Sequence, residues 1–376
     1  MRVLLDVSAV PARPVGAGMY TVALASGLSA RGGIDLHLLT RRDDNDRWRD
    51  LAPTATVHAS APARRPARLA WEQARGPALA DRVRPDVWHG PHYTMPLRAS
   101  VPCMVTVHDL TFFDHPEWHE RSKVPFFRRM IRAAAHRATT LVCVSAYTAD
   151  RLRALVAPTG DIAIIHHGVD HDRFTVAGDQ AKDLAALAEH GIEPPYIAFA
   201  STIEPRKNVP TLVHAFAKVA ATRPELRLVL AGSDGWGARD ARDAIAASGV
   251  ATRVLRPGYL DNETIAAFFR RAEVVAYPSL EEGFGLPALE GLACGAPVVT
   301  SQSSALAEIV GDAALLVPPG NTTALADALR RVLDDSTLSD RLRAAGPARA
   351  ATFTWQACVE QHVVAYEQTA LAGATA

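Results

Sequence analysis

Residues 277–291 read Tyr-Pro-Ser-Leu-Glu-Glu-Gly-Phe-Gly-Leu-Pro-Ala-Leu-Glu-Gly. A buried strand ends at Tyr277, a loop with Gly283 and Gly285 follows, and Pro287 suits the first turn of a helix. Glycines let a backbone approach a ligand closely, and the free amides of a helix start bind anions. The stretch therefore predicts a strand–loop–helix unit of a parallel sheet with an anion site at its turn.

Two carboxylates flank this helix start. Glu282 lies in the loop, and Glu290 lies about one turn into the helix. Taken singly, each has an ordinary explanation, because loop carboxylates are solvated and acidic side chains near a helix N-terminus are favoured by its dipole. Taken together with the glycines, they predict a site where two carboxylates accept hydrogen bonds from hydroxyl groups on either side of a bound diphosphate.

Apolar runs that alternate with helical patterns extend through the whole chain. They predict strands over 3–7, 36–39, 101–107, 140–144, 196–200, 226–231, 274–277 and 296–300. Helical spacing marks 18–30, 124–137, 210–221, 264–271, 324–333 and 354–371. Continuous apolar strands separated by helices are typical of parallel sheets covered on both faces. The predicted class is α/β, with two doubly wound, Rossmann-like domains facing across a cleft.

A polar, helix-like segment over 178–190 and the pair Pro194-Pro195 separate the two sets of strands. We therefore expect a first domain over 1–172, a linker over 173–194 and a second domain over 195–353. A C-terminal helix over 354–376 is expected to cross back to the first domain.

Composition excludes several classes of protein. The chain has 376 residues with 40 basic and 40 acidic side chains, and this balance argues against a protein built for nucleic acid. The four cysteines have no metal or redox spacing and are predicted to be buried in a reducing compartment. The N-terminal stretch Met1-Arg-Val-Leu-Leu-Asp6 reaches a charge too soon for the apolar region of a signal peptide, and no apolar run in the chain approaches about 18 residues. We expect a cytoplasmic location, which includes the inner face of the membrane.

A basic loop follows the strand predicted over 196–200. Arg206 and Lys207 lie at the carboxyl end of that strand, before the helix predicted from 210. Two cations there can hold a diphosphate and stabilise charge that develops on a leaving nucleoside diphosphate. The other explanation is a solvated charge pair next to Glu204.

The first half contains a shorter glycine motif, Gly16-Ala17-Gly18, and a histidine, His108, at the carboxyl end of a strand. The glycines do not complete a dinucleotide-binding motif, because position 21 is Thr. His115 and His119 are four residues apart, but Pro116 interrupts the pair and no third ligand is evident, so no metal site is predicted.

The segment from Glu282 to Glu290 resembles the E-x7-E signature of the retaining nucleotide-sugar glycosyltransferases of family four, also described as glycosyl transferases group 1, which have the two-domain GT-B fold. Similar segments run through the chain: the loop over 201–208, the glycine-rich stretches over 230–232 and 235–237, residues 167–170, and residues 306–318. The Glu-Pro-Arg-Lys-Asn form over 204–208 is similar to bacterial mannosyltransferases of polysaccharide and glycolipid assembly.

The resemblance implies roles for individual residues. Arg206 and Lys207 would neutralise the diphosphate, Glu290 would accept hydrogen bonds from the ribose, and Glu282 would hold hydroxyls of the donor sugar. His108 would contact the donor sugar. The backbones of Gly16, Ala17 and Gly18, and of Phe284, Gly285 and Leu286, would contact phosphate and sugar, and Gly258, Tyr259 and Leu260 would lie near the base. Many relatives carry an Arg where this chain has Ser201, which increases the expected dependence on Arg206.

The same resemblance implies transfer of a hexose with retention, without a metal or cofactor, from a nucleoside diphosphate sugar to a glycan or lipid-linked acceptor. The first domain would bind the acceptor and the second the donor. GDP-mannose is the expected donor, and UDP-sugars are the alternative. A sugar-nucleotide epimerase or hydrolase and a non-catalytic sugar-nucleotide-binding protein stay open. A nicotinamide dehydrogenase is disfavoured by the incomplete glycine motif and by Arg41 and Arg42 where an acid is expected.

A basic amphipathic helix over 121–137 allows a peripheral membrane contact. An apolar stripe of Val124, Phe127 and Ile131 is accompanied by Arg128, Arg129 and Arg132. The pattern fits either a core-facing helix with a solvated basic face or a helix that docks on anionic lipid head groups.

Overall fold

The computed structural model describes residues 1–375 and divides into two compact units, each built around one sheet. The first unit holds residues 1–114, 121–168 and the C-terminal segment from Trp355. The second unit holds residues 115–120 and 169–354. The segment over 173–194, expected as a linker, contains a helix and belongs to the second unit.

The sheet of the first unit is parallel throughout, in the order β3-β2-β1-β4-β5-β6-β7. Its strands are β1 (Arg2–Asp6), β2 (Asp35–Arg41), β3 (Thr56–Ala61), β4 (Val87–Gly90), β5 (Cys103–Val107), β6 (Thr140–Cys143) and β7 (Asp161–Ile164). Its helices are α1 (Ala17–Arg31), α2 (Asn45–Leu51), α3 (Arg65–Val83), α4 (Thr111–Asp114), α5 (Lys123–Arg137), α6 (Ala146–Val156) and α15 (Trp355–Thr375). The strand order reverses between β1 and β4, which creates a topological switch point there.

The sheet of the second unit is also parallel, in the order β10-β9-β8-β11-β12-β13. Its strands are β8 (Tyr196–Ala200), β9 (Arg227–Ala231), β10 (Val254–Gly258), β11 (Val274–Tyr277), β12 (Val298–Ser301) and β13 (Leu315–Val317). Its α-helices are α7 (Gln180–Ala188), α8 (Val209–Ala220), α9 (Ala238–Ala247), α10 (Asn262–Arg270), α11 (Leu286–Ala293), α12 (Ala305–Val310), α13 (Thr322–Asp334) and α14 (Ser336–Ala350). The order reverses between β8 and β11.

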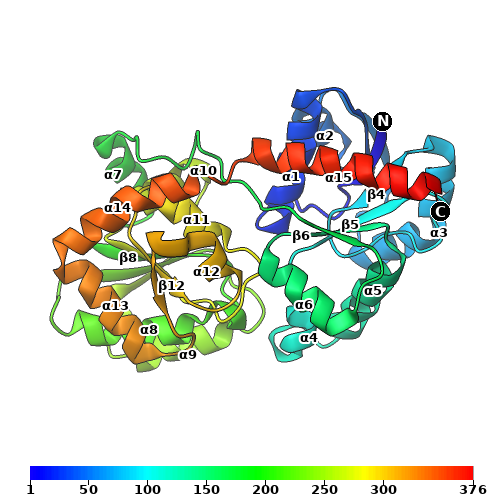
Figure 1. Ribbon diagram of the computed structural model, residues 1–376. Helices are drawn as coiled ribbons and strands as arrows, with labels where there is room; N and C mark the ends of the chain where they lie inside the picture. Colours follow the sequence, from blue (N-terminus) through cyan, green and yellow to red (C-terminus); the bar gives the residue numbers. More distant parts are fainter. Residues whose placement is uncertain (376) are drawn as a thin grey trace. The chain divides into compact units, whose positions relative to one another are not determined.

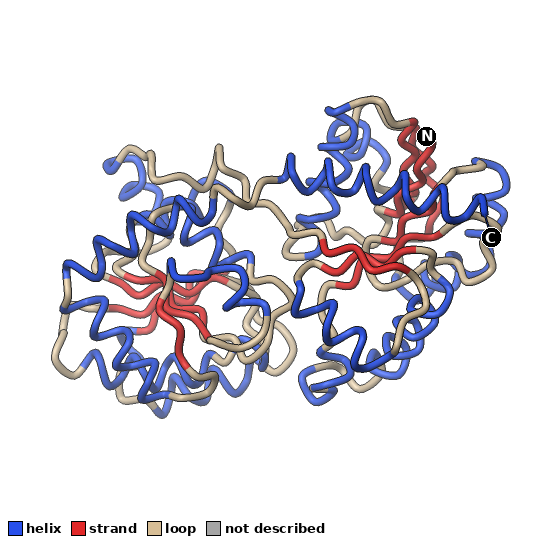
Figure 2. Tube along the Cα trace, viewed as in Figure 1, coloured by secondary structure: helices blue, strands red, loops and turns tan. Residues whose placement is uncertain are grey.

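Each sheet is covered by helices on both faces (Figure 1, Figure 2). In the first unit, alternate residues of β1 enter two different cores: Leu4 packs in one, and Val3 and Leu5 pack in the other. Successive strand residues point to opposite faces. The continuous apolar runs of the sequence are explained by this double burial.

The predicted α/β class with two parallel sheets is confirmed. The strands predicted over 196–200 and 274–277 coincide with β8 and β11, and the other six predicted strands lie within a few residues of β1, β2, β5, β6, β9 and β12. Five strands, β3, β4, β7, β10 and β13, were not predicted. All four cysteines are free and buried, as predicted.

The C-terminal helix α15 packs on the first unit, beside α1 (Figure 1). Gly27 of α1 allows this close approach, because an added Cβ there would lie 2.5 Å from a methyl carbon of Val359. Side chains of α15, among them Cys358, Val363 and Tyr366, enter the same core as the strands.

A buried chain of hydrogen bonds joins α15 to the sheet. Since His362 Nδ1 lies 2.8 Å from the carbonyl of Cys358, it carries the proton, and His362 Nε2 accepts from the Tyr20 hydroxyl at 2.7 Å. Thr106 then donates to Tyr20 at 2.9 Å and accepts from His89 Nε2 at 2.8 Å, and Tyr366 donates to His89 Nδ1 at 2.7 Å. The Cys358 carbonyl thus determines which atom donates and which accepts in every hydrogen bond of this series.

Candidate active site

Two loops meet at the switch point of the second unit. One follows β8 and contains the single 3₁₀ turn Pro205–Lys207, and the other follows β11 and contains Glu282. The amide of Leu280 donates to the carbonyl of Arg206 at 2.8 Å, and Asn208 Nδ2 donates to the carbonyl of Pro278 at 3.3 Å. These bonds hold the two predicted motifs side by side at the edge where parallel sheets bind ligands.

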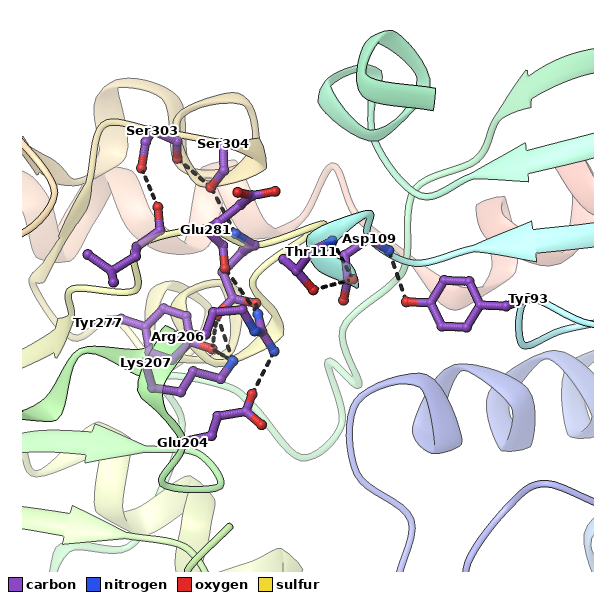
Figure 3. A network of polar contacts seen from close by, with 12 residues as sticks. Tyr93, Asp109, Thr111, Glu204, Arg206, Lys207, Tyr277, Glu281, Ser303 and Ser304 are labelled. Carbon is purple, nitrogen blue, oxygen red and sulfur yellow. Dashed lines mark hydrogen bonds and ion pairs between the residues drawn. The ribbon is translucent and has the colours of Figure 1, made fainter. Parts of the chain in front are cut away.

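Lys207 and Glu282 form a buried ion pair. Lys207 Nζ lies 2.6 Å from Glu282 Oε1 and 2.6 Å from the hydroxyl of Tyr277, which itself donates to Glu282 Oε1 at 2.9 Å (Figure 3). Both charged side chains are only 6% exposed. The three groups form a closed triangle in which Tyr277, not recognised in the sequence as a site residue, accepts from the lysine and donates to the carboxylate.

Arg206 completes the charge balance. Its guanidinium pairs with Glu282 Oε2, donates to Glu204 Oε1 at 2.9 Å and donates to the carbonyl of Glu281 at 3.1 Å (Figure 3). The sequence left Glu204 as a simple charge neighbour, and the structure makes it a direct partner. Two cations and two carboxylates therefore neutralise one another without ligand, which keeps the cations ordered for an incoming anion.

The electrostatics of the cluster favour an ionised Glu282. Burial opposes ionisation of this carboxyl, but Arg206 and Lys207 outweigh it and lower its pKa to about 2. Burial and the neighbouring Arg206 lower the pKa of Lys207, while Glu282 opposes that shift. The carboxylate is thus a permanent hydrogen-bond acceptor at neutral pH.

Glu290 lies on α11, with Arg173 and Asp170 as its charged neighbours. Burial raises its pKa to about 7, with Arg173 lowering it and Asp170 raising it further. The structure therefore brings together Arg206, Lys207 and Glu282 but places Glu290 in a separate electrostatic environment.

The helix start between the two glutamates has the expected geometry. Gly285 precedes α11 with φ of 103°, a conformation that L side chains rarely adopt, and an added Cβ would lie 2.5 Å from Leu306. Phe284 is buried and packs edge-on against Phe353, so only its backbone can serve a ligand. Leu286 is the first residue of α11, whose opening amides are anion donors.

Two serines that the sequence did not single out hold the Glu282 loop. The amide of Glu282 donates to Ser304 Oγ at 3.0 Å, and Ser303 Oγ donates to the carbonyl of Leu280 at 3.0 Å (Figure 3). Ser304 has φ of 63°, a strained backbone value. Only their position after β12 could have indicated this role.

The candidate residues of the first unit cluster around Tyr20. Gly16 precedes α1 with φ of 50°, Ala17 is the first residue of α1, and Gly18 lies in its first turn. Tyr20, one turn further, has its ring 5.2 Å from the ring of His108, in an edge-on arrangement. The glycine segment and the histidine are thus linked inside this unit.

His108 is held as a neutral imidazole. Its Nε2 lies 2.8 Å from the carbonyl of Pro91 and must carry a proton, so Nδ1 is left as an acceptor. Burial lowers the pKa of the ring. The adjacent Asp109 is fixed by Tyr93, whose hydroxyl accepts from its amide at 3.1 Å, and by the hydroxyl of Thr111 at 2.7 Å (Figure 3).

The predicted base segment follows the edge strand β10. Gly258 has φ of 80°, Tyr259 is 42% exposed, and Leu260 is buried. Tyr259 thus places an exposed aromatic ring directly after the end of β10.

The other sequence features concern metals and membranes. Among residues 1–375, no group of three His, Cys, Asp or Glu side chains is placed to hold a metal. No helix within the same range combines the length and apolar character needed to cross a bilayer. In α5, Arg128 donates to the carbonyls of Phe112 at 2.6 Å and Phe113 at 3.1 Å, so this member of the basic stripe is structural.

Comparisons with known proteins agree with this architecture. Residues 184–349 match the family model for glycosyl transferases group 1, and residues 14–173 match that for glycosyltransferase family 4. O-antigen chain mannosyltransferase B of Escherichia coli is 30% identical over 306 residues, covering 80% of this chain and 77% of that protein.

Two solved structures share the fold over nearly the whole chain. Sucrose-phosphate synthase from Thermosynechococcus elongatus has a TM-score of 0.80 at 23% identity, covering 98% of both chains. HepE from Anabaena, in complex with UDP-glucose, has a TM-score of 0.78 at 18% identity, covering 98% of this chain and 100% of the other. The chain therefore belongs to the family-4 glycosyltransferases of group 1, enzymes with the GT-B fold that use nucleotide sugars.

Proposed function

We propose that the protein is a retaining hexosyltransferase that moves mannose from GDP-mannose to a hydroxyl group of a glycan or lipid-linked acceptor. The observation that carries this proposal is the buried cluster of Arg206, Lys207 and Glu282 at the switch point of the second unit. The similarity to an O-antigen chain mannosyltransferase supports mannose and a glycan acceptor.

The cluster supports a mechanism based on positioning and charge. The bond between the anomeric carbon and the leaving phosphate oxygen breaks, and the acceptor oxygen bonds to the same face of that carbon. The acceptor proton moves to the leaving phosphate. Lys207 and Arg206 stabilise the charge that develops on the diphosphate, and the amides at the start of α11 assist them.

The remaining residues orient the substrates. Glu282 accepts hydrogen bonds from donor-sugar hydroxyls, and Glu290 accepts from the ribose. His108 offers Nδ1 to an outer hydroxyl of the donor sugar, and the backbone over 16–18 closes on the distal phosphate. Two cations and helix amides supply the charge that a metal would otherwise provide, so no cofactor is needed.

Donor identity is tested by thermal shift with a panel of nucleoside diphosphate sugars. A donor at about 100 times its Kd adds about 2.7 kcal/mol of stability. GDP-mannose should raise the melting temperature more than GDP, UDP-glucose or UDP-galactose. A shift with UDP-glucose alone would assign the alternative donor class, which HepE bound to UDP-glucose favours.

The reaction type is tested by product analysis. Transfer should need an acceptor, should give a product with the anomeric configuration of the donor, and should survive EDTA. Loss of activity in EDTA that magnesium restores would contradict the metal-free mechanism. Epimerised or free sugar as the only product, formed without acceptor, would assign the epimerase or hydrolase alternative.

A membrane contact is a separate part of the proposal. Arg129, Arg132 and Arg137 of α5, with Arg98, line a cavity of about 750 Å³ between α3 and α5. Within residues 1–375, none of these four pairs with a carboxylate.

We expect the double variant Arg129→Glu/Arg132→Glu to lose flotation with phosphatidylglycerol vesicles, while Arg239→Glu/Arg341→Glu, at exposed sites of the second unit, keeps it. Equal flotation of both variants would refute the contact.

A further inference from the structure

A second pocket lies at the switch point of the first unit, between the carboxyl ends of β1 and β4. It has a volume of about 200 Å³ and is lined by charged and aromatic side chains, among them Asp6, Arg65, Arg68, Glu72, His92 and Phe127. One water needs only about 10–15 Å³, and drug-sized ligands fill about 300–1,000 Å³. The space suits a ligand of about one sugar ring.

Three of the seven polar lining residues come from one face of α3. Arg65, Arg68 and Glu72 are spaced three and four residues apart, so their side chains lie on the same side of the helix. The lining also includes His92, just after β4, and Phe127 of α5. The guanidinium of Arg65 lies over the ring of Phe127, 5.1 Å from its centre.

Two polar atoms of this pocket are buried without a hydrogen-bond partner in the protein. Glu72 is 4% exposed; its Oε2 accepts from the hydroxyl of Thr94 at 2.9 Å, but its Oε1 has no partner. His92 Nδ1 is likewise buried and unpaired. Such groups cost stability unless a ligand satisfies them.

The protonation states of Glu72 and His92 suit hydrogen bonds with hydroxyl groups. Burial and the nearby Asp6 raise the pKa of Glu72 to about 8, and burial raises the pKa of Asp6. Burial and the neighbouring His108 lower the pKa of His92 to about 3. At neutral pH, Glu72 is largely a carboxylic acid and His92 a neutral imidazole, so each can both donate and accept, as a hydroxyl group does.

The pocket also adjoins a candidate catalytic residue within the same unit. The rings of His92 and His108 have centres 5.6 Å apart. A ligand that is hydrogen-bonded to His92 therefore lies close to His108, the histidine proposed to contact the donor sugar.

We propose that this pocket binds the acceptor as a neutral, polyhydroxylated ring, and that Glu72 and His92 determine acceptor specificity through hydrogen bonds to its hydroxyl groups. Only the identification of the ligand as the acceptor rests on the proposed function; the binding of a neutral polyol ring does not depend on it. Phe127 adds an apolar side chain to the lining of the pocket.

The direct test is ligand-observed NMR with methyl α-D-mannopyranoside, methyl α-D-glucopyranoside and mannose 6-phosphate on the full chain without donor. We expect a methyl hexoside to bind wild type and Arg75→Ala, a variant at an exposed site on α3, and binding to fall at least tenfold in Glu72→Leu and less in Glu72→Gln. Binding of the phosphate ester alone, or equal binding to Glu72→Leu and wild type, would overturn the proposal.

Stability and kinetics separate this role from a structural one. Because Glu72 carries an unpaired buried oxygen, Glu72→Leu should not lower the melting temperature, whereas a structural role predicts a clear drop. In transfer assays the variant should raise the acceptor KM at least tenfold and leave donor KM and donor hydrolysis unchanged. If wild type transfers no sugar but binds the hexoside through Glu72, the proposed function fails and the pocket assignment stands.

Discussion

At the residue scale, the ion pair of Lys207 and Glu282 joins two positions 75 residues apart. The sequence indicated both residues from their place after buried strands and from the spacing of the signature. The sequence could not indicate that they form an ion pair with each other, because the order of the strands in the sheet determines which distant residues become neighbours. In the structure, Glu282 is the counter-ion of both Arg206 and Lys207.

This pairing predicts strong coupling between the two residues. Lys207→Met leaves a buried carboxylate with one cation fewer and should cost about 3 kcal/mol of unfolding free energy. Turnover should fall at least about 100-fold, as when one charge-stabilising donor is removed. Urea unfolding and steady-state kinetics provide the measurements.

The matched control is the double variant Lys207→Met/Glu282→Gln, which removes both charges. Its loss of stability should be smaller than the sum of the two single losses, since neither charge is left unpaired. Additive losses would show that the two side chains do not interact in the folded protein.

Glu290 predicts a pH dependence of the opposite sign to that of Glu282. Its pKa rises from 4.5 to about 7 on folding, so the native state holds the proton more tightly. Its contribution to stability is therefore complete below 4.5 and is lost as the pH rises through about 7. Glu290→Gln should gain stability relative to wild type over this window, measured by urea unfolding at several pH values.

Donor affinity should respond to the same titration. Because an ionised carboxylate is the stronger acceptor for ribose hydroxyls, affinity for the donor should rise with pH through about 7 in wild type and change less in Glu290→Gln. Parallel pH profiles for the two proteins would remove Glu290 from the donor site.

At the element scale, central strands were predicted better than edge strands. Four of the missed strands, β3, β7, β10 and β13, lie at sheet edges. β10 carries Arg256 and Pro257 and so lacks a continuous apolar run, and β13 is apolar but only three residues long. β4 is central, but His89 interrupts its pattern. That histidine is buried only because Tyr366 and Thr106 satisfy both ring nitrogens.

The contact of α1 with α15 predicts a second-site rescue. Gly27→Ala would place a methyl group 2.5 Å from Val359 and should cost about 1–3 kcal/mol by overpacking. Val359→Ala should restore most of the loss in the double variant, although alone it destabilises by leaving a cavity. Denaturant unfolding measures all three; no rescue would mean that the helices do not touch at this position.

At the scale of the whole molecule, the chain returns to its first unit through α15. Val359, Val363 and Tyr366 contribute to the core of that unit, and each large side chain contributes about 1.5–3 kcal/mol when buried. The last segment is therefore part of the first unit's core.

Removal of residues 355–376 should destabilise the first unit selectively. Amide hydrogen exchange should accelerate by orders of magnitude in β1, β4 and β5, because their core loses the α15 side chains. Exchange in β8 and β11 should stay slow, since the second unit keeps its own sheet. Equal acceleration in both units, or none in either, would contradict this division.

Apolar periodicity and strand-end motifs are local properties, and they were sufficient to predict the α/β class, most of the central strands and the candidate residues Arg206, Lys207 and Glu282. Only the folded structure shows that Tyr277 and Glu204 join the cluster, that Ser304 holds its loop, and that Arg128 donates to the carbonyls of Phe112 and Phe113. It also decided that Glu72 and His92 share a pocket, since α3 and the residues after β4 meet only when β1 and β4 become neighbours. The order of the strands, which local sequence patterns do not encode, brings these residues together.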